Sequence, residues 1–420
     1  METKKSILKK IGRYIGALGP GIFCIGYTIG TGSVTSMIKS GSQYGMQLLW
    51  VLLLSVIFAA VLMEAYGRYA VVTGETAIHA FKNKLKGGKF WAIFLIIGVV
   101  AGQWSALSGI IGLISSAFYE MTRLFMPSLA ETNYWAILII AMILMGIMYL
   151  LLLVGKYSFF EKVLIVFVSI MGLSFIVTMF VVLPPIEDIV GGLTPSIPIG
   201  GELMVAAFVG TTMAAPTFIV RPLIVKEKGW GRNHLKEQTR DALFSAFLMF
   251  VISASVMIAA TGALFYDGKT VINVLDMVTA LEPAAGKFAV ALFMVGTVSA
   301  GLSSVFPIMM VLPLLLGDYS DGTMDTTSKR FKLWTGVAAL VGLLVPILGT
   351  NPIMSQIATQ VASVFVLPLV IIGILVLINK KQLMGAHKAG ILLNIGLVAA
   401  LIFSLLISYQ GVLGLQSFFN

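Results

Sequence analysis

Long apolar runs separated by short polar connections fill nearly the whole chain. A helix needs about 20 mainly apolar residues to cross a bilayer, and repeated runs of this length predict an all-α integral membrane protein. We expect a single transmembrane domain over residues 1–420. Eleven spans are predicted, at residues 16–38, 46–70, 90–118, 134–154, 160–183, 202–225, 242–266, 286–316, 333–350, 355–378 and 388–409.

Two of these spans are interrupted by residues that disfavour a continuous helix. The first span contains Gly26–Ser33, which has three glycines, and the sixth contains Gly210–Thr217, which includes Pro216. Proline removes a backbone donor from a helix, and an opened helix is tolerated at membrane depth only where it faces protein or a watery cavity. The alternative is an ordinary kink in each helix, which membrane proteins often contain.

The interruptions fall at corresponding places in the two halves of the chain. Paired interruptions of this kind are typical of transporters built from two inverted repeats, with the solute site at the breaks. The pattern predicts five-helix repeats over residues 16–183 and 202–378, with broken helices 1 and 6 and an extra helix at 388–409.

Composition and charge support a membrane protein and set its expected orientation. The chain is 58% hydrophobic and only 11% charged, with a formal net charge of +10. Cytoplasmic loops are rich in Lys and Arg, so the basic N-terminal segment is placed inside and the C-terminus outside the cytoplasmic membrane. With this topology, the excess of Lys and Arg holds the cytoplasmic side of the protein at the membrane surface, and we do not expect it to bind nucleic acid. The outer connections then hold few basic residues, namely Lys39, Arg123, Lys269 and Lys287.

Five short segments stand out along the chain, at Gly19–Gly21, Gly41–Trp50, Val72–Gly74, Gly192–Pro198 and Lys380–Gly385. In sequence, order and spacing they resemble landmarks of the NRAMP family of metal-ion transporters. The resemblance implies the LeuT fold with eleven transmembrane helices and alternating access. For typical members it also implies proton-coupled import of manganese or iron.

The expected metal ligands are missing from this sequence. Where the family carries Asp-Pro-Gly-Asn, this chain has Gly30, Thr31, Gly32 and Ser33. The family's Met-Pro-His motif falls on Ala214, Ala215 and Pro216, and a histidine often found further along falls on Arg221. No Asp, Glu or His occurs in 15–63, 90–119 or 203–225. We therefore expect no metal-ligating residues of the usual kind, and no standard proton-coupled manganese or iron transport.

The remaining chemistry favours a small anion, such as bicarbonate or a short carboxylate, as the leading substrate. Opened helices present backbone amides, and a buried arginine can pair with an anion. Arg221 has the alternatives of snorkelling to the interface or pairing with Glu64 or Glu161. The predicted substrate-binding residues are Gly30, Thr31, Gly32, Ser33, Ala214, Pro216, Thr217, Arg221 and Gln360.

A second polar cluster suggests sodium as a coupling ion. Ser299, Ser303 and Ser304 lie at helical spacing, where sodium-coupled proteins of the LeuT fold combine hydroxyls with first-helix carbonyls, here those of Gly26 and Ile29. The alternative is that these serines allow close helix packing and bond to their own helix.

Other functions remain open to different degrees. The first alternative is a divalent-cation transporter of altered selectivity that moves magnesium with much of its water shell, because magnesium dehydrates reluctantly. A channel or membrane sensor is the second. No enzyme is expected, because no phosphate-binding loop or HExxH pair is present. We expect no resident cofactor, contact with membrane lipid, no nucleic acid, and either a monomer or an oligomer of unknown order.

Overall fold

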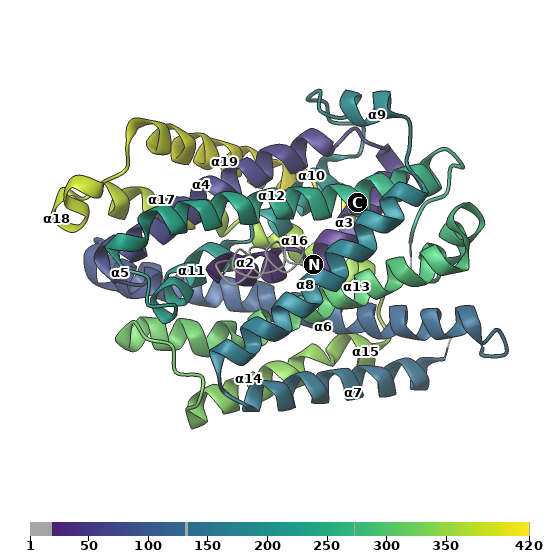
Figure 1. The fold of residues 1–420 in the computed structure, drawn as a ribbon, viewed down its shortest axis with the longest axis horizontal. Helices are drawn as coiled ribbons and strands as arrows, with labels where there is room; N and C mark the ends of the chain where they lie inside the picture. The colour runs from purple at the N-terminus through teal and green to yellow at the C-terminus, as the bar shows by residue number, and fades with distance from the viewer. Residues whose placement is uncertain (1–18, 131–132, 273, 420) are drawn as a thin grey trace, which may run out of the picture.

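The computed structural model describes residues 19–130, 133–272 and 274–419, almost all of them helical (Figure 1). Ten of the described helices are long and apolar enough to cross a membrane. An eleventh span results when the bent pair α2 (Pro20–Thr28) and α3 (Thr31–Tyr44) is counted as one. The all-α membrane architecture and the predicted spans are therefore confirmed.

The first half of the chain contains seven further helical spans or connections after the broken first span. Gly74, with φ +71°, ends the first long helix in a backbone conformation that favours glycine. The elements are α4 (Leu49–Thr73), α5 (Ala77–Lys84), α6 (Gly88–Phe125), α7 (Tyr134–Leu153), α8 (Tyr157–Val181) and the short α9 (Ile186–Gly191), followed by the first half of the sixth span, α10 (Glu202–Thr212).

The second half begins with the other half of the broken sixth span. Gly286, with φ +75°, interrupts the helical conformation inside the longest element. The elements are α11 (Ala215–Glu227), η1 (Arg232–His234), α12 (Leu235–Ala260), the π-helical η2 (Thr261–Phe265), α13 (Val274–Asp321), α14 (Lys329–Gly342), α15 (Leu344–Leu348), α16 (Pro352–Ser363), α17 (Leu367–Asn379), α18 (Lys381–Met384), η3 (Gly385–His387) and α19 (Ile391–Phe419).

The broken helices lie at the centre of the bundle. In the most apolar stretch of the span formed by α10 and α11, 94% of the residues are buried inside the protein. The corresponding share is 22% in α7 and also 22% in α19. Around this centre, α13 packs against α6 and α8, and α12 packs against α3 and α4 (Figure 1). The sixth span is therefore enclosed by other helices, whereas α7 and α19 turn most of their apolar surface outwards, as helices in contact with lipid do.

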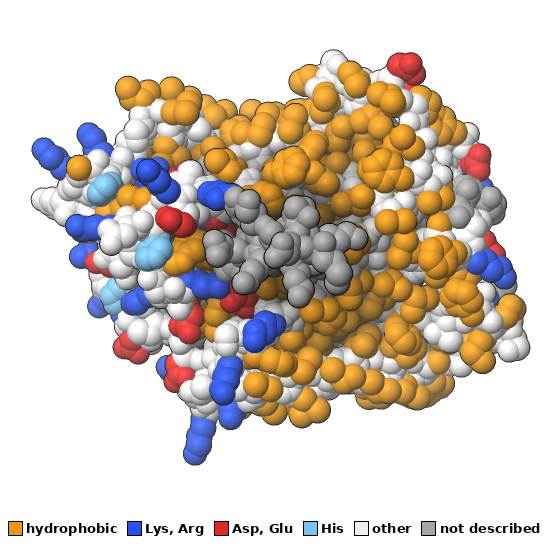
Figure 2. Space-filling model, in the orientation of Figure 1, with side chains coloured by type: hydrophobic (Ala, Val, Ile, Leu, Met, Phe, Trp, Pro, Cys, Tyr) orange, Lys and Arg blue, Asp and Glu red, His pale blue; other side chains and the backbone are white. Residues whose placement is uncertain are grey.

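Charged side chains gather at one end of the molecule. Figure 2 shows Lys and Arg concentrated at the end where Figure 1 places α5 and α18, while hydrophobic side chains cover the middle. This distribution is the one expected of a multi-pass membrane protein with a basic end. Which end faces the cytoplasm remains a prediction from the sequence.

A buried carboxylate fixes the helix at the basic end. Asp318 on α13 is fully buried and accepts hydrogen bonds from the backbone N–H groups of Ile78 (3.0 Å) and His79 (3.1 Å) and from the Thr76 hydroxyl. Both N–H groups belong to the first turn of α5. Backbone N–H groups in the first turn of a helix have no acceptor within their own helix. Asp318 thus caps α5 from another span.

Asp318→Ala is expected to destabilise the protein by about 2–3 kcal/mol, because it leaves several buried donors without an acceptor. Thermal unfolding in detergent would measure the loss. Asp325→Ala serves as the control, because the exposed Asp325 carboxylate accepts hydrogen bonds from its own loop, including two from Thr327. Equal unfolding temperatures for the two variants would contradict the capping role.

Candidate functional site

The first span breaks over two residues. The axes of α2 and α3 differ by 51°. Ile29 (φ −92°, ψ 70°) and Gly30 (φ −97°, ψ −170°) lie between the two half-helices and leave the helical conformation. The carbonyl end of α2 and the amide end of α3 therefore meet inside the bundle, each with unpaired backbone groups.

The sixth span is also interrupted over two residues, but less sharply: Glu202–Glu227 still counts as one span, and among the described residues only the first span is bent by more than 40°. Met213 and Ala214 are non-helical, and Pro216 occupies the first turn of α11. A first-turn position needs no backbone donor, so Pro216 begins the second half-helix after the break rather than disrupting a continuous helix. The paired breaks predicted from the sequence are thus present at residues 29–30 and 213–214.

Hydroxyl groups connect the two breaks. The Thr211 hydroxyl donates to the Thr28 carbonyl oxygen (3.2 Å), and the hydroxyls of Thr28 and Thr217 lie 3.3 Å apart. Thr28 ends α2, Thr211 lies in the last turn of α10 and Thr217 in the first turn of α11. Three of the four half-helices, α2, α10 and α11, therefore meet at one polar centre.

A small cavity lies at this centre. Its volume of about 20 Å³ accommodates a single water-sized group. Its lining residues are Tyr27, Thr28, Gly30, Gly32, Gln103, Ala106, Ile110, Thr211, Ala214, Ser304, Ile308 and Gln360. None of these lining residues is charged, and most of their polar groups are hydroxyls or amides.

Five predicted residues line the cavity: Gly30, Gly32, Ala214, Gln360 and, from the sodium cluster, Ser304. A Cβ atom on Gly30 would lie 2.3 Å from the Ser304 hydroxyl oxygen. A Cβ atom on Gly32 would lie 2.1 Å from the Gln360 side-chain nitrogen. The glycines therefore let two other spans approach the first break closely.

Other predicted residues lie beside the cavity without lining it. The Ser33 hydroxyl is 3.4 Å from that of Ser253, and Thr217 is paired with Thr28. The Thr31 hydroxyl is buried without a hydrogen-bond partner among the described residues, but it is not among the lining residues. Pro216 also lies outside the lining. These positions shape the break rather than face the cavity.

Arg221 lies away from the cavity, in a buried network. Its side chain and that of Asp241 are 0% and 1% exposed, with 2.7 Å between Nη2 and the carboxylate oxygen. It also donates to the amide oxygen of Gln238 (2.6 Å). The expectation that Arg221 offers its charge to an anion needs correction, because Asp241 neutralises that charge and neither residue lines the cavity.

The partner of Arg221 also differs from the two alternatives considered. Glu64 pairs with Arg68 at 2.6 Å, and Glu161 pairs with Lys228 at 2.6 Å. The partner, Asp241, sits on α12 and also accepts from the backbone N–H of Gly21 on α2 (3.2 Å). One carboxylate therefore joins the first half of span one to the second half of span six.

The proposed sodium residues are partly brought together. The Ser304 hydroxyl donates to the Gly26 carbonyl oxygen at 2.7 Å, and Ser303 lies 3.5 Å from the same oxygen. Ser299 is buried on the same helix, and Ile29 stands in the break with its N–H bonded to Ile25. The predicted meeting of span-eight hydroxyls with a first-helix carbonyl is thus present at Gly26.

Several lining residues were missed in the sequence. Tyr27, Thr28 and Thr211 lie within the two interrupted segments but are not among the predicted site residues. The Tyr27 hydroxyl is buried and has no partner among the described residues. Gln103 is a usable signal, because it carries the one amide side chain in the predicted third span, residues 90–118. The apolar lining residues Ala106, Ile110 and Ile308 carried no signal.

No group of three or more His, Cys, Asp or Glu side chains within the described residues could hold a metal ion. The cavity instead offers neutral oxygen atoms from Gln103, Gln360 and hydroxyl groups. Such ligands suit hard cations and do not favour the softer transition metals.

Comparisons with known proteins place this architecture in a family. Residues 21–414 match the family model described as "Natural resistance-associated macrophage protein-like". A relative from Verminephrobacter eiseniae, named divalent metal cation transporter MntH, is 22% identical over 413 residues, covering 95% of this chain and 89% of that protein.

Solved structures share the fold at low sequence identity. A mutant form of the manganese transporter of Eremococcus coleocola superposes with a TM-score of 0.73 and 16% identity, covering 96% of this chain and 86% of the other. MhsT, solved with L-phenylalanine, gives 0.64 and 14%, covering 94% and 98%. The expected LeuT fold is therefore confirmed. With the family match across nearly the whole chain, these findings show that the protein belongs to the Nramp family of secondary transporters.

Proposed function

We propose that this transporter moves a divalent cation, with magnesium as the leading candidate, which crosses with much of its water shell. The observation that carries the proposal is the uncharged, oxygen-lined cavity at the two helix breaks. Relatives along most of the chain are named divalent metal cation transporters, which favours a cation over an anion.

The lining chemistry supports a hard cation. Gln103 and Gln360 can each present an amide oxygen, while Thr28 and Thr211 present hydroxyl oxygens. In addition, α2 and α10 end at this centre, so backbone carbonyl oxygens of their last turns are further neutral ligands. Because carboxylate and thioether ligands are absent from the lining, tight binding of a bare transition-metal ion is not favoured.

The small cavity agrees with an ion that enters only after the half-helices separate. A volume of about 20 Å³ holds one water-sized group, so a magnesium ion with several waters does not fit the closed arrangement. In alternating access, one repeat moves against the other and opens the site to one side at a time. Neutral ligands can then exchange with the outer waters of the ion without stripping the inner ones.

The anion hypothesis loses its charged group. It combined the backbone amides at the two breaks with Arg221, and the Arg221 side chain is buried against Asp241 outside the cavity. The amide ends of α3 and α11 remain at the breaks, but the carbonyl ends of α2 and α10 lie there too, so backbone dipoles alone favour neither sign.

Sodium is our candidate for the coupling ion. Its proposed place is beside the Gly26 carbonyl oxygen, which Ser304 and Ser303 approach within 2.7 and 3.5 Å. A sodium ion there would replace these hydrogen bonds with oxygen contacts.

Uptake into proteoliposomes tests the proposed function. Magnesium, manganese, bicarbonate and short carboxylates should be offered separately, each under an imposed sodium or proton gradient. We expect saturable magnesium uptake that an inward sodium gradient accelerates. Saturable anion uptake without magnesium uptake would overturn the proposal, and currents far above carrier turnover would indicate a channel.

Gln103→Ala and Gln360→Ala are each expected to lower the apparent affinity for magnesium by about tenfold or more, because each removes a polar ligand to a charged group. Gln382→Ala, on the exposed surface at α18, is the matched control and should leave uptake unchanged. Initial rates over a range of magnesium concentrations measure the effect. If both cavity variants bind magnesium with the affinity of the wild type, the two amide side chains do not contact the transported ion.

A further inference from the structure

A cleft between α8 and α11 lies at the basic end of the bundle. Its volume is about 550 Å³, and its walls come from the start of α8, the end of α11 and the connection between α13 and α14. Gly322 in that connection lies against His79 of α5, which places the cleft at this end. The α8–α11 cleft shares no lining residue with the central cavity.

The described part of the chain begins at the rim of this cleft. Gly19 is the first described residue, and a Cβ atom on it would lie 2.1 Å from Cε of Lys228, which lines the cleft. The residues that precede Gly19 therefore join the bundle beside the cleft. Arg13 is six residues away, a distance of roughly 20 Å or less in an extended chain. The basic residues of this segment are thus within reach of the cleft.

The charges that line the cleft leave acids without a basic partner. Glu161 and Lys228 bind each other at 2.6 Å, so their charges cancel. Glu227 and Asp325 form no ion pair within the part of the chain that the structure describes, and Lys156 is the remaining cation of the lining. Two carboxylates against one ammonium group leave the cleft with a net negative charge.

Both acids are placed so that their negative charge persists. The N–H and hydroxyl of Thr327 donate to the Asp325 carboxylate (2.9 and 2.8 Å), and these bonds lower the pKa of that carboxyl. Glu227 is the last residue of α11, where the carbonyl end of the helix adds partial negative charge. A cation at this end of α11 is therefore stabilised by the carboxylates and by the helix itself.

A neutral group of the lining also lacks a partner. Tyr157 is 8% exposed, and its hydroxyl has no hydrogen-bond partner among the described residues. A buried polar group without a partner is costly, so an occupant that reaches this hydroxyl gains a hydrogen bond.

We propose that the N-terminal segment, residues 1–18, docks in the α8–α11 cleft, with Glu227 and Asp325 as the counter-charges for its basic side chains. The segment contains five basic residues and a single acid. Because it is tethered at the rim, its effective concentration at the cleft exceeds that of a free partner.

Docking would connect elements that belong to both broken spans. The segment leads into α2, and the cleft is formed by α11 and α8. These helices must move apart if the site is to open at the basic end, so a docked segment favours the arrangement closed there. The inference does not depend on which ion is transported.

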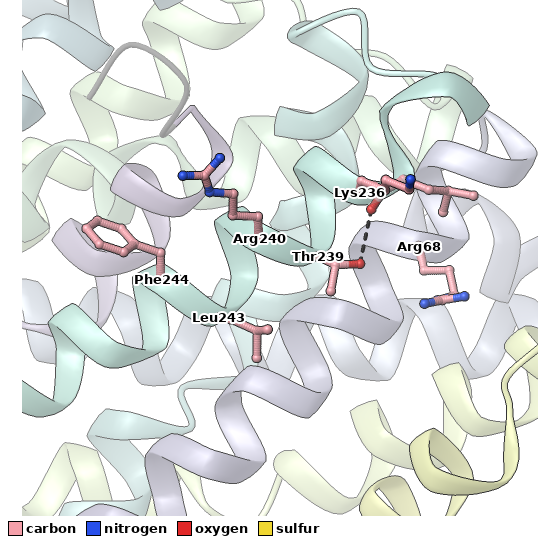
Figure 3. A pocket seen from close by; sticks show the side chains of 7 residues that line it. Arg68, Lys236, Thr239, Arg240, Leu243 and Phe244 are labelled. Atoms are coloured by element: carbon pink, nitrogen blue, oxygen red, sulfur yellow. Dashed lines mark hydrogen bonds between the residues drawn. The ribbon is translucent and has the colours of Figure 1, made fainter. Parts of the chain in front are cut away.

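A second groove offers a comparison surface at the same end. It is formed by α4 and α12, and its lining contains Arg68, Lys236 and Arg240 but no carboxylate (Figure 3). Thr239 lies on α12 between the last two of these residues. This groove offers a basic segment no counter-charge from its lining.

Disulfide cross-linking of the full-length protein tests the proposal. Gly12→Cys should be combined with Ser158→Cys, an exposed position in the cleft, or with Thr239→Cys in the second groove. The natural Cys24 is the single cysteine and is fully buried, so it does not compete. Mass spectrometry of proteolytic fragments identifies the bond. We expect rapid cross-linking to Ser158→Cys and little to Thr239→Cys, both in detergent and in nanodiscs of phosphatidylglycerol.

Charge variants identify the cause of the proximity. Glu227→Gln with Asp325→Asn should slow cross-linking to Ser158→Cys by about threefold or more, because two surface ion pairs are lost. Glu187→Gln with Glu237→Gln removes the same charge from exposed positions outside the cleft and should change nothing.

Three results would overturn the docking. They are equal cross-linking to the cleft and to the second groove, a rate that the cleft variant leaves unchanged, and cross-linking in detergent that disappears in phosphatidylglycerol. The last result would assign the segment to the anionic lipid surface.

Discussion

Asp241→Ala is expected to have the largest effect on folding of any substitution considered. The variant leaves the Arg221 guanidinium buried without its counter-charge, and Arg221 is 0% exposed. Removing one partner of a buried ion pair costs about 3–5 kcal/mol. The Gly21 N–H also loses its acceptor, so the contact between α2 and α12 weakens.

The measurement is the recovery of monodisperse protein in detergent together with its unfolding temperature. Glu237→Ala is the matched control, because it removes an exposed acid from the same helix, one turn before Asp241. We expect the control to unfold like the wild type and Asp241→Ala to be recovered poorly. If the two variants behave alike, the buried pair does not stabilise the bundle.

A paired substitution separates the charge from the packing. Arg221→Met with Asp241→Leu removes both charges and fills the space with apolar atoms, which is often neutral or stabilising at buried ion pairs. We expect this double variant to recover most of the stability that Asp241→Ala loses. If the double variant is as unstable as Asp241→Ala, the lost stability comes from altered packing or from the lost hydrogen bond between Arg221 and Gln238, and not from an unpaired charge.

The fold was largely predictable because hydrophobic length is a strong constraint. Each of the eleven predicted ranges overlaps a described span, and both interruptions fall where glycines or Pro216 disfavour a continuous helix. In a membrane, unpaired backbone groups cannot face lipid, so a break in the sequence pattern has few structural interpretations.

The partner of Arg221 was not predictable from the same pattern. Hydropathy gives the length of a span but not its rotation about its own axis. Asp241 precedes the predicted seventh span, which was placed at 242–266, whereas the helix extends back to Leu235. The carboxylate therefore counted as part of a polar connection, although the structure buries it against α11 and α2.

Rotation also explains the mixed result for the cavity. The residues Gly30, Thr31, Gly32 and Ser33 were chosen together because they follow one another at the break, but only the two glycines line the cavity. Once α3 begins at Thr31, successive residues point about 100° apart around the helix. Consecutive positions therefore cannot all face one ligand, and Tyr27 and Thr28 on the other side of the break face it instead.

Gly210→Ala is expected to have the largest effect on transport among substitutions outside the cavity lining. A Cβ atom on Gly210 would lie 1.9 Å from the backbone oxygen of Gln360 and 2.7 Å from its carbonyl carbon. Backbone atoms cannot rotate away as a side chain can, so α10 and α16 must separate. Gln360 then moves away from the cavity that it lines.

Overpacking of this kind costs about 1–3 kcal/mol of stability, so the folded protein should still be recoverable. Magnesium uptake is expected to fall by about tenfold or more, because displacing Gln360 removes its amide as a ligand to the ion. Initial uptake rates and unfolding temperature should be measured on the same preparations, so that lost transport is not mistaken for lost protein.

Gly102→Ala provides the matched comparison. Gly102 lies on α6 next to Gln103, and the nearest atom to its added Cβ would be the Ser363 hydroxyl oxygen at 3.7 Å, an ordinary contact. We expect this variant to transport like the wild type. Both variants add one methyl group to a helix near the site, and only at Gly210 does that group meet another backbone. Equal transport by both would mean that the close approach of α10 to α16 does not position Gln360, whereas loss at Gly210 alone assigns that positioning to the glycine.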